Sequence, residues 1–377
     1  MKILSPISIL EYGSTCVRLV LYDQNTINNN LFFEEKIDFT RKENPLDEKK
    51  IFSLITNAEK NLDQHLNEIL LILDDTSIFS LDLCIQKNYE KKIITNNDID
   101  YLIKECETEI KINNKEKDIL HTIKSKIILD DIVIDEIENN STKSSKVNLE
   151  IKFILIDKII YDFFKNLFLK KHISLSKIFC KSYIKSLGLI NKLDISGYNS
   201  FIDIGLKKSC LTIFKDKKLL YINYTHIGGD HITKDISKIL KIDYRQAESK
   251  KIKFFKKNNK ENIINEDEFL KKIINSRLEE IVEILFLNCP LTKNSFLNSN
   301  LELFFVGNGS KVLNKNLLSF GPEFNFIKGM AIIDENNYDC CNSAIEFDIS
   351  SKKIQPKRSL VNIENKGFFE KLFSYFN

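Results

Sequence analysis

The chain has 377 residues, of which 43% are hydrophobic, and its 56 Lys and Arg nearly balance its 53 Asp and Glu. This length predicts roughly two to four domains, and the balanced charge argues against a basic field that would attract nucleic acid. The eight cysteines form no C-x-x-C pair and no apolar run reaches the roughly 18–20 residues of a membrane span, so we expect neither a zinc or disulfide frame nor a transmembrane helix.

One strand pattern occurs twice. The first copy predicts strands over 7–13, 17–22 and 31–39, with Glu11-Tyr12-Gly13 closing the first strand. The second copy begins at 201–205, closes its first strand with Asp203-Ile204-Gly205, and continues through strands at 210–214 and 219–224. The copies lie about 190 residues apart, and such a repeat indicates a duplicated architecture.

A differently patterned block separates the two copies. It contains strand-like runs and one helix whose apolar positions follow a spacing of three and four residues after the capping segment 95–98. The runs are 69–73, 81–85, 126–137 and 147–156, and the apolar helix positions are Ile99, Leu102, Ile103, Cys106 and Ile110. We interpret 67–149 as an inserted α+β subdomain.

After the second copy, Gly228-Gly229-Asp230 opens a predicted helix, and a long amphipathic helix runs from Leu270 to Leu285. On that long helix Arg277 and Glu280 are interpreted as a solvated face, with contact to an adenosine ring as the alternative. A strand over 301–306 then ends in Gly307-Asn308-Gly309.

The C-terminal part changes character again. Residues 350–366 are polar and predict a flexible linker, and 367–377 are strongly apolar. In a helix, one side of this tail would carry Phe368, Phe369, Leu372, Phe373 and Phe376. We expect an amphipathic membrane-binding helix, with a helix docked on the protein's own surface as the alternative.

Two strand-end turns with an acid and a glycine, together with a Gly-x-Gly loop, suit the binding of phosphate groups. Glycine lets backbone N–H groups approach phosphate oxygens, and a carboxylate holds magnesium through water. The order of the motifs resembles the actin, heat-shock-chaperone and sugar-kinase superfamily, and within it the bacterial cell-division protein FtsA. The matching segments are Glu11 to Thr15, Asp203-Ile204-Gly205, Ile227 to Ile236, Gln246 to Lys251, Gly307-Asn308-Gly309 and Asn342-Ser343-Ala344.

The resemblance covers nearly the whole chain and implies an α/β fold. This is the duplicated, two-lobed actin-like fold with a ribonuclease H-like core and an inserted subdomain of the 1C (SHS2-like) kind. The implied subdomains are lobe 1A at 1–66 and 150–197, 1C at 67–149, lobe 2A at 198–228 and 298–349, and 2B at 229–297.

The resemblance also implies a site for ATP with magnesium. Its cofactor-binding residues would be Glu11, Gly13, Ser14, Thr15, Asp203, Gly205, Gly228, Gly229, Gly307 and Gly309, with Asp203 toward the metal. Where the family carries three glycines and a threonine, this chain has Gly205-Leu206-Lys207-Lys208, so we expect weaker nucleotide binding unless Lys207 or Lys208 supplies compensating charge. The segment 179–182 offers no carboxylate or amide to orient water, so we expect slow or absent hydrolysis and no catalytic residue.

By the same resemblance the chain would be a scaffold at the division site. It would anchor FtsZ filaments to anionic lipid at the cytoplasmic side of the inner membrane, recruit later division proteins and self-associate into filaments, without binding nucleic acid. Subdomain 2B would receive the C-terminal peptide of FtsZ through Lys250, Lys251 and Lys253. The alternatives are a type IV pilus adaptor of the PilM kind and an ATP-dependent kinase or chaperone.

Overall fold

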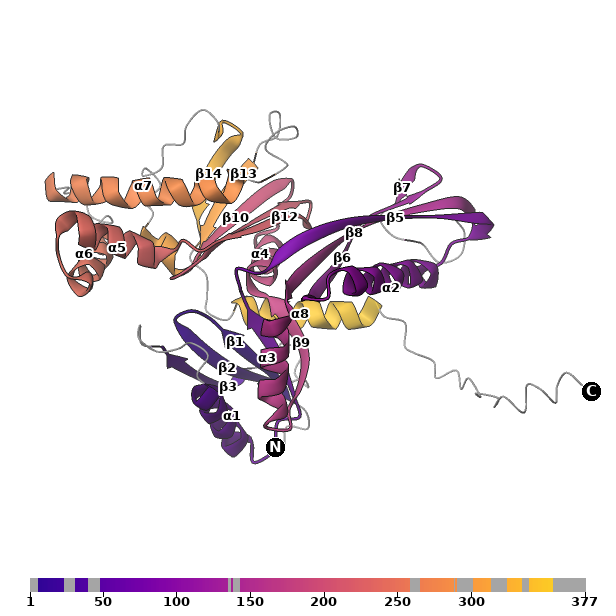
Figure 1. Cartoon of the computed structure of the whole chain (residues 1–377), viewed down its shortest axis with the longest axis horizontal. Coiled ribbons are helices and arrows are strands. Elements are labelled where there is room, and N and C mark those ends of the chain that lie inside the picture. Colours follow the sequence, from indigo (N-terminus) through magenta and orange to yellow (C-terminus); the bar gives the residue numbers. More distant parts are fainter. Residues whose placement is uncertain are drawn as a thin grey trace, which may run out of the picture.

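The structure is a computed structural model of the chain (Figure 1). It describes residues 6–23, 31–39, 48–134, 137, 143–257, 265–287, 289, 301–312, 324–333 and 339–354. The tail that carries the five apolar residues between Phe368 and Phe376, and the linker beyond Ile354, lie outside the described residues.

The first lobe is built on a five-stranded sheet with the order β3-β2-β1-β4-β9. Its strands are β1 (Pro6–Tyr12), β2 (Cys16–Asp23), β3 (Leu31–Asp38), β4 (Glu68–Leu73) and β9 (Ser174–Cys180). Strand β1 pairs antiparallel with β2 and parallel with β4, and β4 pairs parallel with β9. Helices α1 (Glu48–Leu62) and α3 (Lys158–Leu169) accompany this sheet (Figure 1).

The second lobe repeats this topology. Its sheet has the order β12-β11-β10-β13-β14, and the antiparallel and parallel pairings occupy the same positions as in the first sheet. The strands are β10 (Tyr198–Ile204), β11 (Ser209–Lys215), β12 (Lys218–Thr225), β13 (Leu301–Val306) and β14 (Ile327–Ile332). Glu11 and Asp203 are each the last but one residue of the equivalent strands β1 and β10. The predicted duplication is confirmed.

The inserted block is a four-stranded antiparallel sheet with the order β5-β8-β6-β7, packed on one helix. It comprises β5 (Phe79–Ile93), α2 (Asn96–Asn113), β6 (Lys117–Leu129), β7 (Ile132–Ile134) and β8 (Lys143–Asp157). The range 67–149 was wrong at both ends, because β4 pairs inside the first lobe and β8 continues to Asp157. Both errors arise because buried strands of either sheet are apolar runs that look alike in sequence.

Two helices lie between the lobes, and three cover the outside of the second lobe (Figure 1). Helix α4 (Lys181–Leu193) connects β9 to β10 and packs on α8 (Asp339–Ile354). A Cβ at Gly188 of α4 would lie 1.8 Å from Ser343 Oγ of α8, so glycine is what permits this close crossing. The linker prediction was wrong at its start, because α8 continues through 350–354.

The outer helices of the second lobe are α5 (Gly229–Leu240), α6 (Tyr244–Lys257) and α7 (Asn265–Leu287). They pack with the second sheet in a core that includes Ile232, Ile274 and Leu278, whereas a separate core joins the inner faces of both sheets with α4 and α8. A short 3₁₀ turn, η2 (Asn308–Val312), follows β13.

Candidate functional site

The acids of the two turns meet cations of the protein itself. Glu11 Oε1 lies 2.8 Å from Lys181 Nζ, and its other oxygen accepts a hydrogen bond from the Arg18 guanidinium. Asp203 Oδ2 lies 2.7 Å from Lys185 Nζ. All of these side chains are largely buried. The two carboxylates that the sequence assigns to the cofactor are therefore engaged in internal ion pairs.

Local geometry explains these pairs. Helix α4 begins directly at the end of β9, so Lys181 is its first residue and Lys185 follows one turn later on the same face. One lysine consequently faces the acid of the first lobe and the other faces the acid of the second. Arg18 meets Glu11 because the two residues are directly opposite each other in the antiparallel pair β1–β2.

The electrostatics follow from burial and these partners. Burial alone would raise the pKa of the Glu11 carboxyl, but Lys181 and Arg18 lower it to about 2. Burial likewise opposes ionisation of Asp203, yet Lys185 and Lys181 lower the pKa of that carboxyl below its usual value. Burial would lower the pKa of the Lys181 ammonium, but Glu11 and Asp203 raise it well above its usual value. The site therefore holds carboxylates and ammonium groups in their charged forms.

The glycines of the second lobe lie close together, and they contact the backbone of neighbouring loops. Gly205, Gly228, Gly229, Gly307 and Gly309 lie around the end of β10. A Cβ at Gly228 would lie 2.6 Å from the Gly205 carbonyl oxygen, and one at Gly307, whose φ is +86°, would lie 2.2 Å from Asp203 Oδ1. These glycines permit close packing of the loops.

The N–H groups at the start of α5 are also used inside the protein. The Gly229 N–H donates to the Gly205 carbonyl at 2.9 Å, and the Asp230 N–H donates to the Leu206 carbonyl at 2.8 Å. The Gly205 N–H closes the turn onto the Lys208 carbonyl. These are donors that a helix N-terminus could otherwise present to a phosphate.

The turn of the first lobe is simpler. The Gly13 N–H donates to the Cys16 carbonyl at 2.9 Å, and the Thr15 carbonyl accepts from the Phe39 N–H at 2.7 Å. Ser14 is half-buried and the Thr15 side chain is exposed. A Cβ at Gly13 would make only ordinary contact, 3.4 Å from the Cys16 carbonyl oxygen, so no close approach requires this glycine.

A second polar cluster joins the lobes at Asp74, which follows β4 in the first lobe. The Tyr224 hydroxyl of β12 donates to Asp74 Oδ1 at 2.8 Å, and the Lys208 ammonium donates to the Asp74 backbone carbonyl. Within the first lobe, the Ser182 N–H and hydroxyl donate to the two oxygens of the same carboxylate at 3.0 and 2.5 Å. Lys208 therefore spans the lobes, and Lys207 is exposed.

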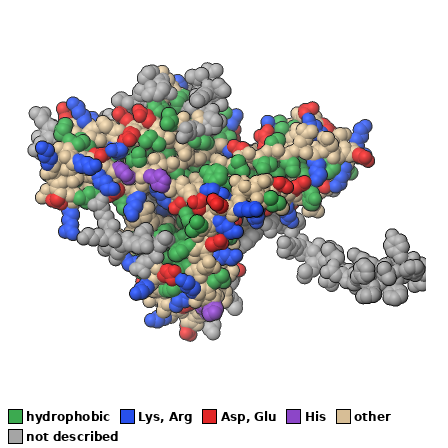
Figure 2. Space-filling view, viewed as in Figure 1, with side chains coloured by type: hydrophobic (Ala, Val, Ile, Leu, Met, Phe, Trp, Pro, Cys, Tyr) green, Lys and Arg blue, Asp and Glu red, His purple; other side chains and the backbone are tan. Residues whose placement is uncertain are grey.

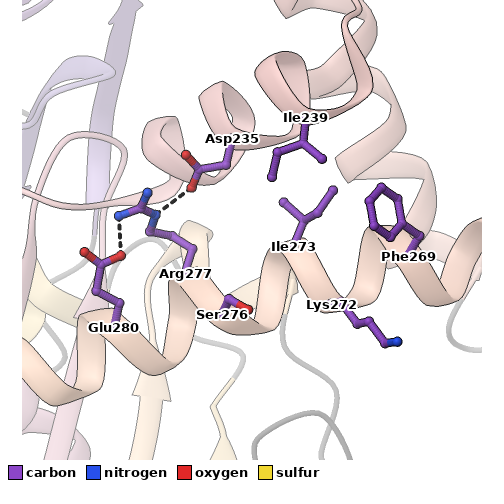
Figure 3. Close-up of a pocket in the computed structure, with 8 residues that line it drawn as sticks. All are labelled: Asp235, Ile239, Phe269, Lys272, Ile273, Ser276, Arg277 and Glu280. Atoms are coloured by element: carbon purple, nitrogen blue, oxygen red, sulfur yellow. Dashed lines mark hydrogen bonds and ion pairs between the residues drawn. The ribbon is translucent and has the colours of Figure 1, made fainter.

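A surface pocket of about 360 Å³ lies between α5 and α7 (Figure 3). Ile239, Phe269 and Ile273 form its apolar lining, and Ile239 and Phe269 are about half exposed. Arg277 lies at one end, where its Nε is 2.6 Å from Asp235 Oδ2 and its Nη1 pairs with Glu280. Lys272 and Ser276 complete the wall. The prediction of a solvated face at Arg277 and Glu280 was incomplete, because Arg277 connects two helices.

The predicted basic face of α6 is only partly present. Lys250 and Lys253 are exposed, but Lys251 is 7% exposed and its ammonium donates to Thr233 Oγ1 at 2.6 Å and to the Gly229 carbonyl at 3.1 Å. Lys251 therefore fastens α6 to the start of α5 and was wrongly assigned to a partner-binding surface. Figure 2 shows basic and acidic side chains intermixed over the face that it displays.

We did not predict from the sequence several residues of the strand-end acid cluster, of the Asp74 cluster and of the pocket. Lys181 lies in the segment 179–182, where a carboxylate or amide was sought, and Lys185 follows it by four residues, a spacing at a helix start that was an available signal. Arg18 was a second signal, because it is a charge inside the apolar strand Val17 to Tyr22. Asp74 carried a local signal as well, because it directly follows the apolar run 69–73, whereas nothing local marks Tyr224 or Phe269, whose roles depend on tertiary contacts.

Two equivalent sheets with strand-end acids, joined by central helices and carrying an insertion after β4, define the actin-like fold. Against solved structures, the PilM-PilN type IV pilus biogenesis complex aligns with a TM-score of 0.58 over 94% of this chain and 100% of that chain, at 12% identity. This likeness shows the fold, and the predicted fold class is confirmed.

Residues 200–334 match the family model of the cell division protein FtsA, so the predicted resemblance is confirmed over this segment. Two proteins described as cell division protein FtsA, from two strains of Helicobacter pylori, are each 22% identical over 162 residues, which is 43% of this chain. The match spans 32% of the length of these curated relatives, about a third.

The described ranges contain no helix long and apolar enough to cross a bilayer. Over the same ranges, no three His, Cys, Asp or Glu side chains gather in a way that could hold a metal ion.

Proposed function

We propose that the chain is a cell-division scaffold that ties FtsZ filaments to the cytoplasmic side of the inner membrane at the division site. The observation that carries this proposal is the match of residues 200–334 to the FtsA family model. That segment contains most of the second lobe together with α5, α6 and α7, and it includes all residues of the pocket. Recruitment of later division proteins and self-association into filaments belong to the same proposal.

The pocket between α5 and α7 is where we place the filament's C-terminal peptide. Half-exposed Phe269 and Ile239 offer apolar area that gains from being covered, as the centre of a small interface requires. Lys272 and Arg277 at its wall suit acidic or carbonyl groups of a short peptide. Because Asp235 and Glu280 balance these two cations, apolar burial would supply most of the affinity.

A fluorescence-anisotropy titration with a labelled C-terminal FtsZ peptide tests this placement. Truncating an anchor residue typically costs about 1–2 kcal/mol, so Phe269→Ala should weaken binding by roughly 5- to 30-fold. Lys250→Ala, which changes an exposed side chain of α6, is the control and should change peptide binding less than twofold. The opposite pattern, with loss on changing Lys250 or Lys253 and none at Phe269, would move the site to α6.

Membrane attachment is proposed for the C-terminal tail, from its sequence alone. Five apolar residues on one helical side, with Lys357, Arg358 and Lys366 shortly before them, suit an anionic lipid surface. A single short helix binds weakly, so firm attachment would come from several tails held together by one filament.

Magnesium and ATP do not fit the site as it stands. Glu11 and Asp203 are ion-paired, and the Gly229 and Asp230 N–H groups are bonded to backbone carbonyls. We therefore expect weak ATP binding, with turnover near background. This disfavours the kinase and chaperone alternatives. The pilus-adaptor alternative is supported by the structural similarity to the PilM-PilN complex, but at 12% identity this similarity supports the fold alone.

A further inference from the structure

We propose that side chains of this protein hold its two lobes together at the site where the resemblance to FtsA implies magnesium and nucleotide. These contacts would hold the lobes whether or not the protein acts as a scaffold. Two groups of contacts join the lobes: the ion pairs that α4 makes with the turn acids, and the contacts that Asp74 receives from the second lobe.

The first group lies on one helix face. Lys181 binds Glu11 at the end of β1 and Lys185 binds Asp203 at the end of β10, at 2.8 and 2.7 Å. These strand-end acids occupy equivalent positions in the two sheets. A bound cation between two such acids would draw the lobes together. Here Lys185, on the helix that follows β9 of the first lobe, supplies that attraction to Asp203 permanently, while Lys181 pairs with Glu11 of its own lobe.

The second group crosses directly from one lobe to the other. The Tyr224 hydroxyl and the Lys208 ammonium, both of the second lobe, reach the carboxylate and the backbone carbonyl of Asp74 in the first lobe. The Tyr224 hydroxyl also lies 3.2 Å from Cys180 Sγ at the end of β9. Lys208 stands in the turn where a glycine-rich sequence would contact phosphate, so the departure from glycine creates a contact between lobes.

Burial strengthens the contacts between the lobes. The Asp203 and Lys185 side chains are 14% and 6% exposed, so water competes little for them. Opening the lobes would break the hydrogen bonds that Tyr224 and Lys208 make to Asp74, and water would have to replace them. The lobes should therefore keep one relative orientation whether or not nucleotide is present.

Hydrogen–deuterium exchange of the full chain, with and without Mg²⁺ and ATP, tests this inference. In the parent protein we expect exchange of the amides in β12 and in 205–209 to be the same under both conditions. In Tyr224→Phe with Lys208→Met, which removes both contacts to Asp74 but keeps the side-chain bulk, exchange there should rise roughly tenfold.

Ser182→Ala is the matched control, because it removes a bond to Asp74 within the first lobe. It should leave exchange in β12 and 205–209 within about twofold of the parent if that protection comes from the contacts between lobes. If the double variant does not fold, Tyr224→Phe alone serves in its place. It removes one oxygen and should raise exchange in β12 and 205–209 by a smaller factor. Protection in the parent that depends on Mg²⁺ and ATP would overturn the inference, as would a double variant that exchanges like the parent or like Ser182→Ala.

Discussion

Replacing Lys185 by methionine is the perturbation whose size can be estimated most directly from the structure. The change keeps the apolar stem and removes the ammonium that lies 2.7 Å from Asp203 Oδ2. Breaking a buried ion pair by removing one partner costs about 3–5 kcal/mol. We expect about 3 kcal/mol at pH 7, the lower end, because Lys181 still attracts Asp203.

The loss should depend on pH with a definite sign. In the parent, Lys185 and Lys181 outweigh burial and hold the folded-state pKa of Asp203 below its unfolded value near 3.9, so Asp203 stabilises the fold above that value. Its contribution is lost as the pH falls through the folded-state pKa. Without Lys185, burial dominates and raises the folded-state pKa, so stability is lost as the pH rises through that value. The difference between parent and variant should therefore be larger at pH 7 than at pH 4.5.

Urea unfolding followed by circular dichroism at both pH values measures this difference. Lys192→Met, an exposed lysine in the last turn of the same helix, is the control and should cost less than about 0.5 kcal/mol. Adding Asp203→Asn to Lys185→Met removes the unpaired charge and should restore a large part of the loss. A loss below about 1 kcal/mol at both pH values, or no recovery with Asp203→Asn, would refute the reasoning.

Two further predictions follow from buried groups. Burial, with Lys177 nearby, lowers the pKa of His121 to about 3, so below pH 6.5 the unfolded chain takes up a proton that the fold excludes, and the free energy of unfolding should fall by about 1.4 kcal/mol per pH unit between pH 6 and 4. His121→Gln should remove that part of the slope in urea titrations, and an unchanged slope would contradict the assignment. Gly228→Ala should lower the free energy of unfolding by about 1–3 kcal/mol, because its Cβ would lie 2.6 Å from the Gly205 carbonyl oxygen, whereas Gly13→Ala should lower it by less than 1 kcal/mol. Equal shifts in melting temperature for the two variants would show that the loop at Gly205 moves to make room for the added Cβ.

Much of the fold could be predicted because its signals are local. The repeated strand, acid and glycine pattern indicated two equivalent sheets, and the rarity of glycine pointed to the loops at 205, 228 and 307. The same residue types could not reveal what they contact. A glycine that allows a phosphate to approach cannot be distinguished by sequence from one that allows a neighbouring carbonyl group to approach.

The content of the site was harder to predict for the same physical reason. Which cation meets Asp203 depends on how α4 is rotated against the second sheet, and that is decided by packing between the lobes, including the contact of Gly188 with Ser343. Lys251 was misassigned because α6 is rich in lysine on several sides, so its sequence does not show which side faces α5. Strand β4 was misassigned because pairing partners are set by the whole sheet.

Co-sedimentation of FtsZ filaments with anionic liposomes tests the proposed scaffold most directly. We predict that the full chain carries filaments into the liposome pellet, that removing residues 367–377 abolishes this, and that changing Phe269 to Ala reduces it, while circular dichroism stays unchanged. Filaments that pellet equally well with the shortened chain, or that never pellet with the full chain, would contradict the proposed tether.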